Sequence, residues 1–335
     1  MKTSDFDYHL PEERIAYRPA AERQNSKLMV LGRGTGEITH RKFFELPGLL
    51  RPGDLLVLND TKVIPARLFG RKESGEKAEI LLAGKRDCRT WTCLVRNPKE
   101  GLVIEFEGGP SGRLFRGKRG EWLIEFVEEP DAYIDASGRM PLPPYIRREP
   151  DAGDRVTYQT VYARKPGAIA APTAGLHFTP GLLEEIGLRG VRTAYVTLHV
   201  GIGTFLPVKA ESVEEHVMHA EWREIPAETA DAVNKAKSGG GRVIAVGTTV
   251  LRTLESSVNE AGEVAPCNGE TDLFILPGHR FKAADALITN FHLPRSTLLM
   301  LVTAFAGRDP IFRAYEEALG LDYRFLSYGD AMLIE

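Results

Sequence analysis

The chain has 335 residues, enough for two domains of ordinary size and for a core that needs no disulfide or structural metal. With 43% hydrophobic residues, 27% charged residues and a net charge of -3, its composition is that of a globular protein. Cys88, Cys93 and Cys267 lack the even number and the spacing of a disulfide framework, which indicates a reducing compartment. The most apolar run, 298–306, is far shorter than the roughly 18 residues of a membrane span, and the charged N-terminus does not resemble a signal peptide. We therefore expect a cytoplasmic protein without membrane contact.

The N-terminal part of the chain predicts mixed structure. The apolar run 27–31 is typical of a strand, the glycine-rich residues 32–36 predict a turn, and 37–44 predict a returning strand. Because a strand and not a helix follows these glycines, we interpret them as a hairpin turn and not as a dinucleotide-binding loop. A second apolar strand is expected at 55–58, and polar residues follow it.

Between about residues 66 and 127 the pattern changes to short β runs separated by glycines and charged turns. Strands at this spacing without intervening helices predict a small antiparallel barrel. The expected strands are 79–83, 90–96, 102–107, 112–116 and 121–127. The proline-rich stretch 140–145 predicts an extended linker.

After residue 160 strands alternate with capped helices. Thr179 precedes a proline at the first helical position, which predicts a helix start, and Gly187 is expected just beyond that helix. Further helices are expected at 226–237, 250–258, 294–306 and from 309 to about 320, and strands at 242–246, 286–289 and 331–334.

This alternation implies a partly parallel sheet covered by helices. We predict the α/β class: a discontinuous α/β domain built from both chain ends, residues 1–63 and 149–335, with an inserted antiparallel β-barrel domain at 64–148.

Polar side chains stand near the ends of several apolar strands, where ligands collect in open α/β sheets. Asp60, His177, His199 and His292 are the candidates for catalysis, because carboxylates and imidazoles transfer protons near neutral pH. For each histidine the alternative is a hydrogen-bonded residue of the core.

His216 and His219 would share one face if they lay on a helix, as a metal site requires. The sequence offers no third ligand, so we interpret them as a hydrogen-bonded polar cluster and expect no metal. A metal-dependent hydrolase is nevertheless the rival enzyme class. No Walker loop or Gly-x-Ser-x-Gly elbow is present, and the glycine-rich loop of an ordinary methyltransferase is missing.

Basic residues are concentrated in the predicted barrel. The densest group is Arg113, Arg116, Lys118 and Arg119, which we predict to bind RNA phosphates. The alternative is a solvated strand face with acidic residues between the basic ones. A binding module without catalysis would explain this group, but not the polar residues at so many strand ends.

Several long sequence motifs resemble those of the S-adenosylmethionine:tRNA ribosyltransferase-isomerases, and the resemblance extends from end to end of the chain. The matching stretches are 51–70, 140–146, 158–163, 170–179, 197–205, 271–275, 289–294 and 327–334. The one departure is Arg223, where an aromatic residue is expected, and it has little bearing on the chemistry.

The resemblance implies an α/β protein with an inserted barrel and a particular reaction. The ribosyl group of S-adenosylmethionine is transferred and isomerised onto 7-aminomethyl-7-deazaguanine (preQ1) at the wobble position of tRNA. Epoxyqueuosine forms, and adenine and methionine leave. S-adenosylmethionine is a co-substrate, and no cofactor is called for. We expect a monomer.

This chemistry needs a base beside the sulfonium-acidified ribose carbon, an acid for the departing adenine and an acceptor for the proton of the attacking amine. Which of Asp60, His177, His199 and His292 serves each step stays open. The candidates for substrate binding are Asn59, Lys62, Thr173, Gly175, Gly201, Gly203, Thr248, Thr249, Arg252, Asp272 and Asn290.

Among these candidates, Lys62, Arg252 and the N–H groups of Thr248 and Thr249 suit the methionine carboxylate or tRNA phosphates. Asp272 suits the sulfonium or the amino group.

Overall fold

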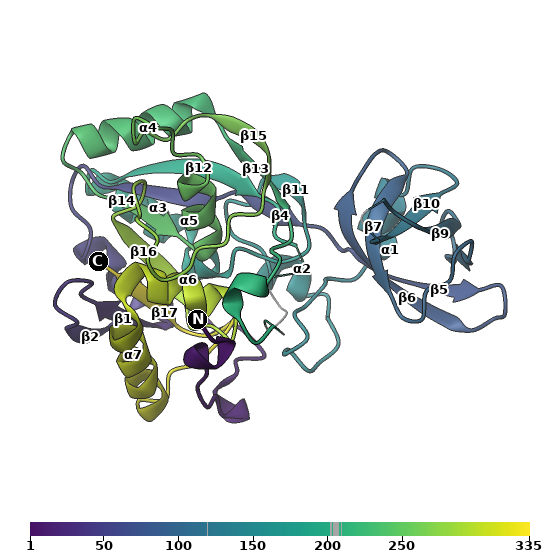
Figure 1. The fold of residues 1–335 in the computed structure, drawn as a ribbon, viewed down its shortest axis with the longest axis horizontal. Helices are drawn as coiled ribbons and strands as arrows, with labels where there is room; N and C mark the ends of the chain where they lie inside the picture. Colours follow the sequence, from purple (N-terminus) through teal and green to yellow (C-terminus); the bar gives the residue numbers. More distant parts are fainter. Residues whose placement is uncertain (119, 202, 204–207, 209) are drawn as a thin grey trace.

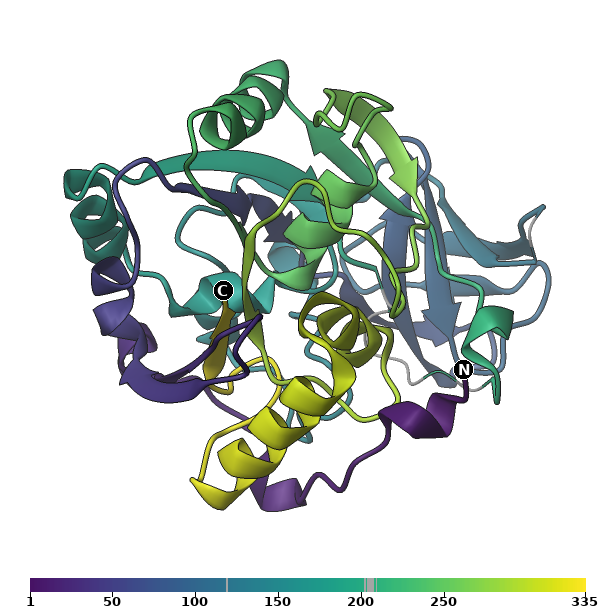
Figure 2. The same cartoon turned by 60° about the vertical axis from the view of Figure 1, so that its left-hand side comes forward.

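The computed structural model describes residues 1–118, 120–201, 203, 208 and 210–335. A β-barrel projects from one side of an α/β body, and both ends of the chain lie in that body (Figure 1). Turning the molecule by 60° brings the α/β body forward, with the barrel behind it (Figure 2). In the described part of the chain, no helix is long and apolar enough to cross a membrane. The predicted α/β fold with an antiparallel barrel is confirmed.

The α/β body is built on a nine-stranded sheet in the order β15-β13-β12-β3-β14-β16-β17-β1-β2. Its strands are β1 (Lys27–Leu31), β2 (Ile38–Lys42), β3 (Leu55–Asn59), β12 (Arg192–Leu198), β13 (Glu221–Ile225), β14 (Val243–Val246), β15 (Cys267–Thr271), β16 (Ala286–Asn290) and β17 (Ala331–Ile334). The four central strands β12, β3, β14 and β16 are parallel. A separate two-stranded sheet pairs β4 (Thr61–Val63) with β11 (Lys165–Ala168).

Strand β3 shows why the sheet has helices on both faces. Every residue of β3 is buried, and Leu55 and Val57 belong to a different apolar cluster from Leu56 and Leu58. Because successive side chains of a strand point to opposite faces, both faces of the sheet must be covered.

Helices supply that cover. The α-helices of the body are α2 (Asp154–Thr157), α3 (Pro180–Leu188), α4 (Ala227–Ser238), α5 (Thr248–Glu255), α6 (Thr297–Ala306) and α7 (Arg308–Gly320). Short 3-10 helices are η1 (Thr3–Phe6), η2 (Glu12–Arg14), η3 (Arg23–Asn25), η4 (Phe43–Gly48), η5 (Thr173–His177) and η7 (Val213–Glu215). Apolar residues of α4, α5, α6 and α7 pack on the face of Leu55 and Val57, whereas α3 and η4 pack on the other.

Several predicted helix boundaries were wrong by one turn or less. The Thr179 hydroxyl caps α3 as predicted, accepting from Leu182 N, but α3 continues through Gly187. Helix α5 begins at Thr248 and not at residue 250, and α6 begins only after Ser296, whose hydroxyl caps it. Strands β13 and β15 were missed because polar residues interrupt their apolar pattern near the edge of the sheet.

The barrel closes in the order β10-β7-β6-β5-β8-β9. Its strands are β5 (Arg67–Lys72), β6 (Lys77–Lys85), β7 (Thr90–Val95), β8 (Val103–Glu105), β9 (Gly112–Arg116) and β10 (Trp122–Phe126), and helix α1 (Asp131–Ser137) follows. Alternate residues such as Ile80, Leu82 and Ile124 fill the interior. The domain boundaries at 63/64 and 148/149 stay predictions.

Strand β5, which the sequence did not predict, contains Gly70 in place of an apolar residue. A β-carbon at Gly70 would lie 2.6 Å from the carbonyl oxygen of Glu105, where β5 pairs with β8. The close approach of two strands therefore requires glycine here, and glycine weakens the sequence signal of a strand.

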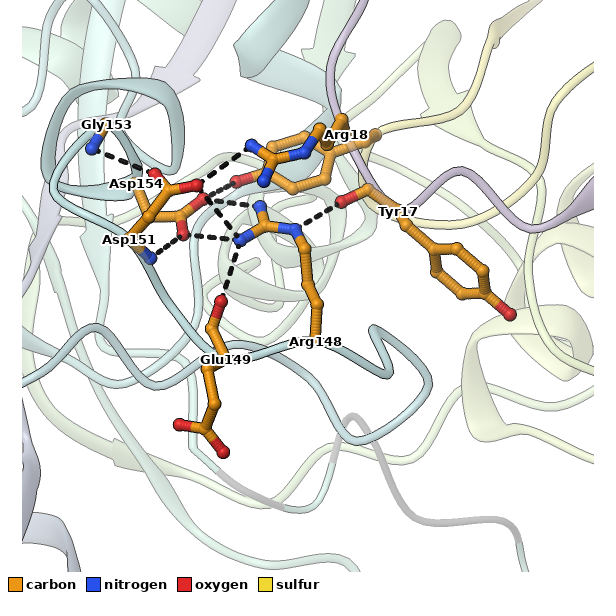
Figure 3. Close-up of polar contacts among 8 residues, drawn as sticks. Tyr17, Arg18, Arg148, Glu149, Asp151, Gly153 and Asp154 are labelled. Carbon is orange, nitrogen blue, oxygen red and sulfur yellow. Dashed lines mark hydrogen bonds and ion pairs between the residues drawn. The ribbon is translucent and has the colours of Figure 1, made fainter.

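The chain returns from the barrel to the body through a polar network around Arg148 (Figure 3). Its guanidinium forms two 2.7 Å hydrogen bonds with the carboxylate of Asp154 and a 3.0 Å bond with the carbonyl of Tyr17. Arg18 pairs with the neighbouring Asp151 at 2.9 Å. The network thus fastens the end of the linker to the N-terminal segment.

Candidate active site

The carboxyl ends of the parallel strands meet at one edge of the sheet and surround a cavity. Three segments at the end of β16 or after β11 and β14 form most of its wall, at 289–293, 170–174 and 247–249. Open α/β sheets bind ligands at such an edge. Of the predicted site residues, Thr173, Thr248, Thr249, Asn290 and His292 line this cavity.

Helix α5 points its N-terminus at the cavity. Gly247 precedes the helix with φ 99°, a conformation that favours glycine, and its N–H donates to the carbonyl of Ile288 on β16. The next residues, Thr248 and Thr249, form the first helical turn and line the cavity. Because first-turn N–H groups have no acceptor within their helix, this wall favours a polar or anionic ligand group.

His292 lies in the wall of the same cavity. Its Nε2 is 2.8 Å from the hydroxyl of Thr289, and its backbone N–H donates to the Tyr315 hydroxyl at 2.9 Å. Burial lowers the pKa of His292 to about 3. The imidazole is therefore neutral at pH 7 and acts there as a hydrogen-bonding group, not as a stored positive charge.

His177 is buried behind the cavity and does not line it. Its Nδ1 is 2.8 Å from the Ser26 hydroxyl, its Nε2 is 3.3 Å from the amide nitrogen of Asn290, and its ring stacks on Phe43. Burial is the main cause that lowers the pKa of His177 to about 3. Thr173 donates to Asn290 Oδ1 at 2.9 Å, so the amide of Asn290 joins His177 to the cavity wall.

Asp60 is the centre of a second group of polar residues, at the ends of β3 and β12. Its buried carboxylate accepts hydrogen bonds from Thr197 at 2.6 Å and from Arg164 at 2.8 Å. The preceding residue, Asn59, donates to the carbonyl of Leu198 at 3.0 Å and to the Thr249 hydroxyl at 3.4 Å. Asn59 therefore links this group to the cavity.

His199 belongs to the Asp60 group and is only partly buried. Its Nδ1 is 2.8 Å from the Thr61 hydroxyl, and its ring stacks on Trp222 with centroids 4.8 Å apart. Burial lowers the pKa of His199, and the charge of Asp60 opposes this effect. The structure thus brings His199 and Asp60 together, whereas His177 and His292 lie in separate hydrogen-bonded groups. The residues Thr61 and Trp222 were missed because only the folded chain places them against an imidazole.

Four other residues predicted to bind substrate do not line the first cavity. Lys62 and Asp272 are exposed. Gly175 is buried against Tyr162, and a β-carbon at Gly203 would lie 3.0 Å from the His219 ring.

A buried ion pair joins helix α5 to strand β13. Arg252 pairs with Glu221, whose Oε1 accepts a 2.8 Å hydrogen bond from Gly201 N. Glu221 was missed as a partner because it is separated from Arg252 by 31 residues.

His216 and His219 do not lie on a helix, so the shared helical face that a metal site would need is not formed. His216 follows the 3-10 helix η7, and His219 lies beyond it in irregular structure. Within the described ranges, no group of three His, Cys, Asp or Glu side chains is placed to hold a metal ion.

The predicted phosphate-binding residues lie on the barrel. Arg113, Arg116 and Lys118 are exposed in and after β9, and Arg119 lies outside the described residues. The guanidinium of Arg116 lies 4.7 Å from the ring centroid of Trp122. RNA binding by this surface stays a prediction.

A cavity at the carboxyl edge of parallel strands, lined by a helix N-terminus and a neutral imidazole, is the arrangement of a small-molecule site in an α/β enzyme. The family described as "Queuosine biosynthesis protein" matches residues 3–334, and the chain belongs to this family.

Relatives of known name match the whole chain. A protein of Geobacter sulfurreducens is 56% identical over 342 residues, and one of Pelobacter propionicus is 52% identical over 343 residues; each alignment covers 100% of both chains. Both are named S-adenosylmethionine:tRNA ribosyltransferase-isomerase. The crystal structure of S-adenosylmethionine tRNA ribosyltransferase from Thermotoga maritima is 42% identical, with a TM-score of 0.59 over 99% of this chain and 100% of that chain. The resemblance found in the sequence motifs is confirmed.

Proposed function

We propose that the protein is a transferase-isomerase that moves the ribosyl group of S-adenosylmethionine onto preQ1 at the wobble position of tRNA. The products are epoxyqueuosine-tRNA, adenine and methionine. The observation that carries this proposal is the 56% identity, over the whole chain, to a ribosyltransferase-isomerase. These comparisons favour it over a metal-dependent hydrolase and over a tRNA-binding protein without catalysis.

The cavity at the sheet edge suits the nucleoside part of S-adenosylmethionine. Its wall combines apolar side chains such as Phe291 and Leu298 with the polar groups of Thr248, Asn290 and His292. Ligand pockets commonly combine apolar walls with a few polar groups that orient the ligand. In this placement the neutral His292 forms hydrogen bonds to the substrate.

His199 is our candidate for the proton acceptor. Its lowered pKa keeps the imidazole neutral at pH 7, so it can accept a proton from the ribose carbon or from the attacking amine. The negative charge of Asp60 would stabilise the imidazolium that forms, and the Thr61 hydroxyl orients the ring. Asp60, His177 and His292 remain candidates for the other proton transfers.

tRNA is the macromolecular partner in this proposal, S-adenosylmethionine is a co-substrate, and the protein works as a monomer without metal or redox cofactor. Incubation with S-adenosylmethionine and preQ1-containing tRNA should release adenine and methionine in equal amounts without added metal. Production of S-adenosylhomocysteine would instead show an ordinary methyltransferase and contradict the proposal.

A further inference from the structure

A second cavity adjoins the first and shares the side chain of Leu298 with it. Arg252 and Glu221 form its polar side, and Leu273, Phe274 and Leu301 contribute apolar groups. The second cavity therefore combines a buried ion pair with an apolar wall, beside the proposed nucleoside site.

Arg252 has an unused donor in this cavity. Its Nε donates to the carbonyl of Leu273 at 3.0 Å and its Nη1 pairs with Glu221, whereas its Nη2 is buried without a hydrogen-bond partner among the described residues. The side chain is 4% exposed. A guanidinium presents its N–H groups in a planar fork that suits a carboxylate, and an unpaired buried donor favours a ligand that satisfies it.

Helix α5 connects the two cavities. Thr249 lies in the wall of the first cavity, and Arg252, three residues later, lies in the wall of the second. Residues three apart share one face of a helix, so a single elongated ligand along this face would meet both. Leu298 of α6 contributes to both walls.

The charge of the second cavity indicates the kind of ligand group. Arg252 is already balanced by Glu221, so a simple anion would leave the site with an excess negative charge. A zwitterion keeps the site neutral, with its carboxylate on Arg252 and its ammonium group on Glu221. Among the described residues, one oxygen of Glu221 accepts from Gly201 N and the other from Arg252, whereas a carboxylate has roughly four acceptor positions.

We propose that this second cavity holds the amino-acid end of S-adenosylmethionine. Arg252 Nη2 donates to the α-carboxylate, Glu221 accepts from the α-ammonium group, and the methionine chain lies against Leu273 and Leu298. This inference rests on the proposed function, because it takes the nucleoside to occupy the first cavity.

The test removes the carboxylate from the ligand, so that the unmodified protein is measured first. Equilibrium binding of S-adenosylmethionine and of its decarboxylated analogue is compared by calorimetry. We expect the analogue to bind about tenfold more weakly or worse, as loss of a charged hydrogen bond predicts. Equal affinity for the two ligands would overturn the inference.

A variant then assigns the effect to Arg252. Arg252→Lys should weaken binding of S-adenosylmethionine and leave binding of the decarboxylated analogue nearly unchanged, so that the discrimination shrinks. Arg242→Lys is the matched control, since Arg242, just before β14, is also largely buried and is paired with the carboxylate of Asp54. It should retain the discrimination. Equal loss for both ligands in Arg252→Lys would show a structural role and overturn the inference.

Adenine release separates this inference from the proposed function. If adenine is released from S-adenosylmethionine and tRNA while both ligands bind equally, the subsite is wrong and the proposed function stands. If the protein neither binds S-adenosylmethionine nor releases adenine, both are wrong.

Discussion

The hydroxyl of Thr61 lies 2.8 Å from Nδ1 of His199, and Thr61 directly follows Asp60 in the chain. Two successive residues therefore supply the hydroxyl that orients the imidazole and the carboxylate whose charge raises the pKa of His199. Trp222 stacks on the ring. Gly167 packs so closely against the imidazole that a β-carbon there would lie 2.6 Å from Nε2. His177 and His292 are almost fully buried, so His199 is the most accessible of the three predicted catalytic histidines.

We predict that His199→Ala lowers the rate of adenine release by about a hundredfold or more, as loss of a general base does, with little change in melting temperature. His177→Ala should lower the melting temperature, because it removes the packing of a buried ring against Ser26 and Phe43. His9→Ala, at an exposed position, is the control and should change neither. If His177→Ala and His199→Ala both retain near-normal turnover, the acid/base role passes to carboxylates such as Asp60 or Asp272.

The rate should also depend on pH through His199. Burial lowers the pKa of His199, so the neutral form that accepts a proton persists to a pH below the ordinary value of about 6.5. We expect kcat/KM to be constant near neutral pH and to fall as the pH drops through this lowered pKa. An acidic limb that is unchanged when His199 is replaced by glutamine would assign it to another group.

The free energy of unfolding should decrease as the pH falls, because His177 and His292 are buried as neutral imidazoles. Burial lowers the pKa of each to about 3, so the unfolded chain binds protons below about pH 6.5 that the folded protein excludes. The stabilisation is complete above pH 6.5 and is lost as the pH falls toward 3. Each histidine should contribute a slope of about 1.4 kcal/mol per pH unit within this window. Denaturant unfolding at several pH values measures it, and His177→Gln should reduce the slope; an unchanged slope would contradict the prediction.

The network in Figure 3 predicts a large loss of stability for Arg148→Ala. Asp154 is 1% exposed in its side chain, and removal of Arg148 would leave that buried carboxylate without its cationic partner, with hydrogen bonds from Asp151 N and the Tyr328 hydroxyl remaining. We expect a loss of about 3–5 kcal/mol in the free energy of unfolding. The neighbouring Arg147, 68% exposed and paired with the exposed Glu12, is the matched control, and Arg147→Ala should cost less than about 1 kcal/mol. Similar losses for both variants would show that the network does not stabilise the fold in this way.

The barrel surface is tested by replacing Arg113, Arg116, Lys118 and Arg119 with alanine. tRNA binding should weaken, and its dependence on salt should decrease by roughly 0.7–0.9 in logarithmic slope for each phosphate that the variant no longer neutralises. S-adenosylmethionine affinity should stay the same. Lys235→Ala, which removes an exposed charge from α4, is the control. An unchanged salt slope in the fourfold variant would place the RNA surface on the α/β domain.

Much of the fold could be predicted because its signals are local. The alternation of β9 at 112–116, the capping Thr179 and the closing strand at 331–334 depend on residues within a few positions of one another, and the structure has them where they were expected. The strand β5 was missed because it contains Gly70 where an apolar residue would have signalled a strand. Glycine is required there by the close approach of Glu105 on the neighbouring strand β8, which no pattern within β5 reveals. The spacing of His216 and His219 would suit one face of a helix, but the structure has no helix there, because spacing alone does not form one.

The sequence by itself determined the family, the fold class and the polar residues at the strand ends. Only the tertiary structure decided how those residues are grouped: His199 with Asp60, His177 with Ser26, and Arg252 with Glu221. Ser26 and His177 are separated by 151 residues and Arg252 and Glu221 by 31, so no local pattern relates them. The parallel order of the strands brings their ends to one edge. Burial there decides which imidazole stays accessible, and it leaves Arg252 Nη2 without a hydrogen-bond partner among the described residues.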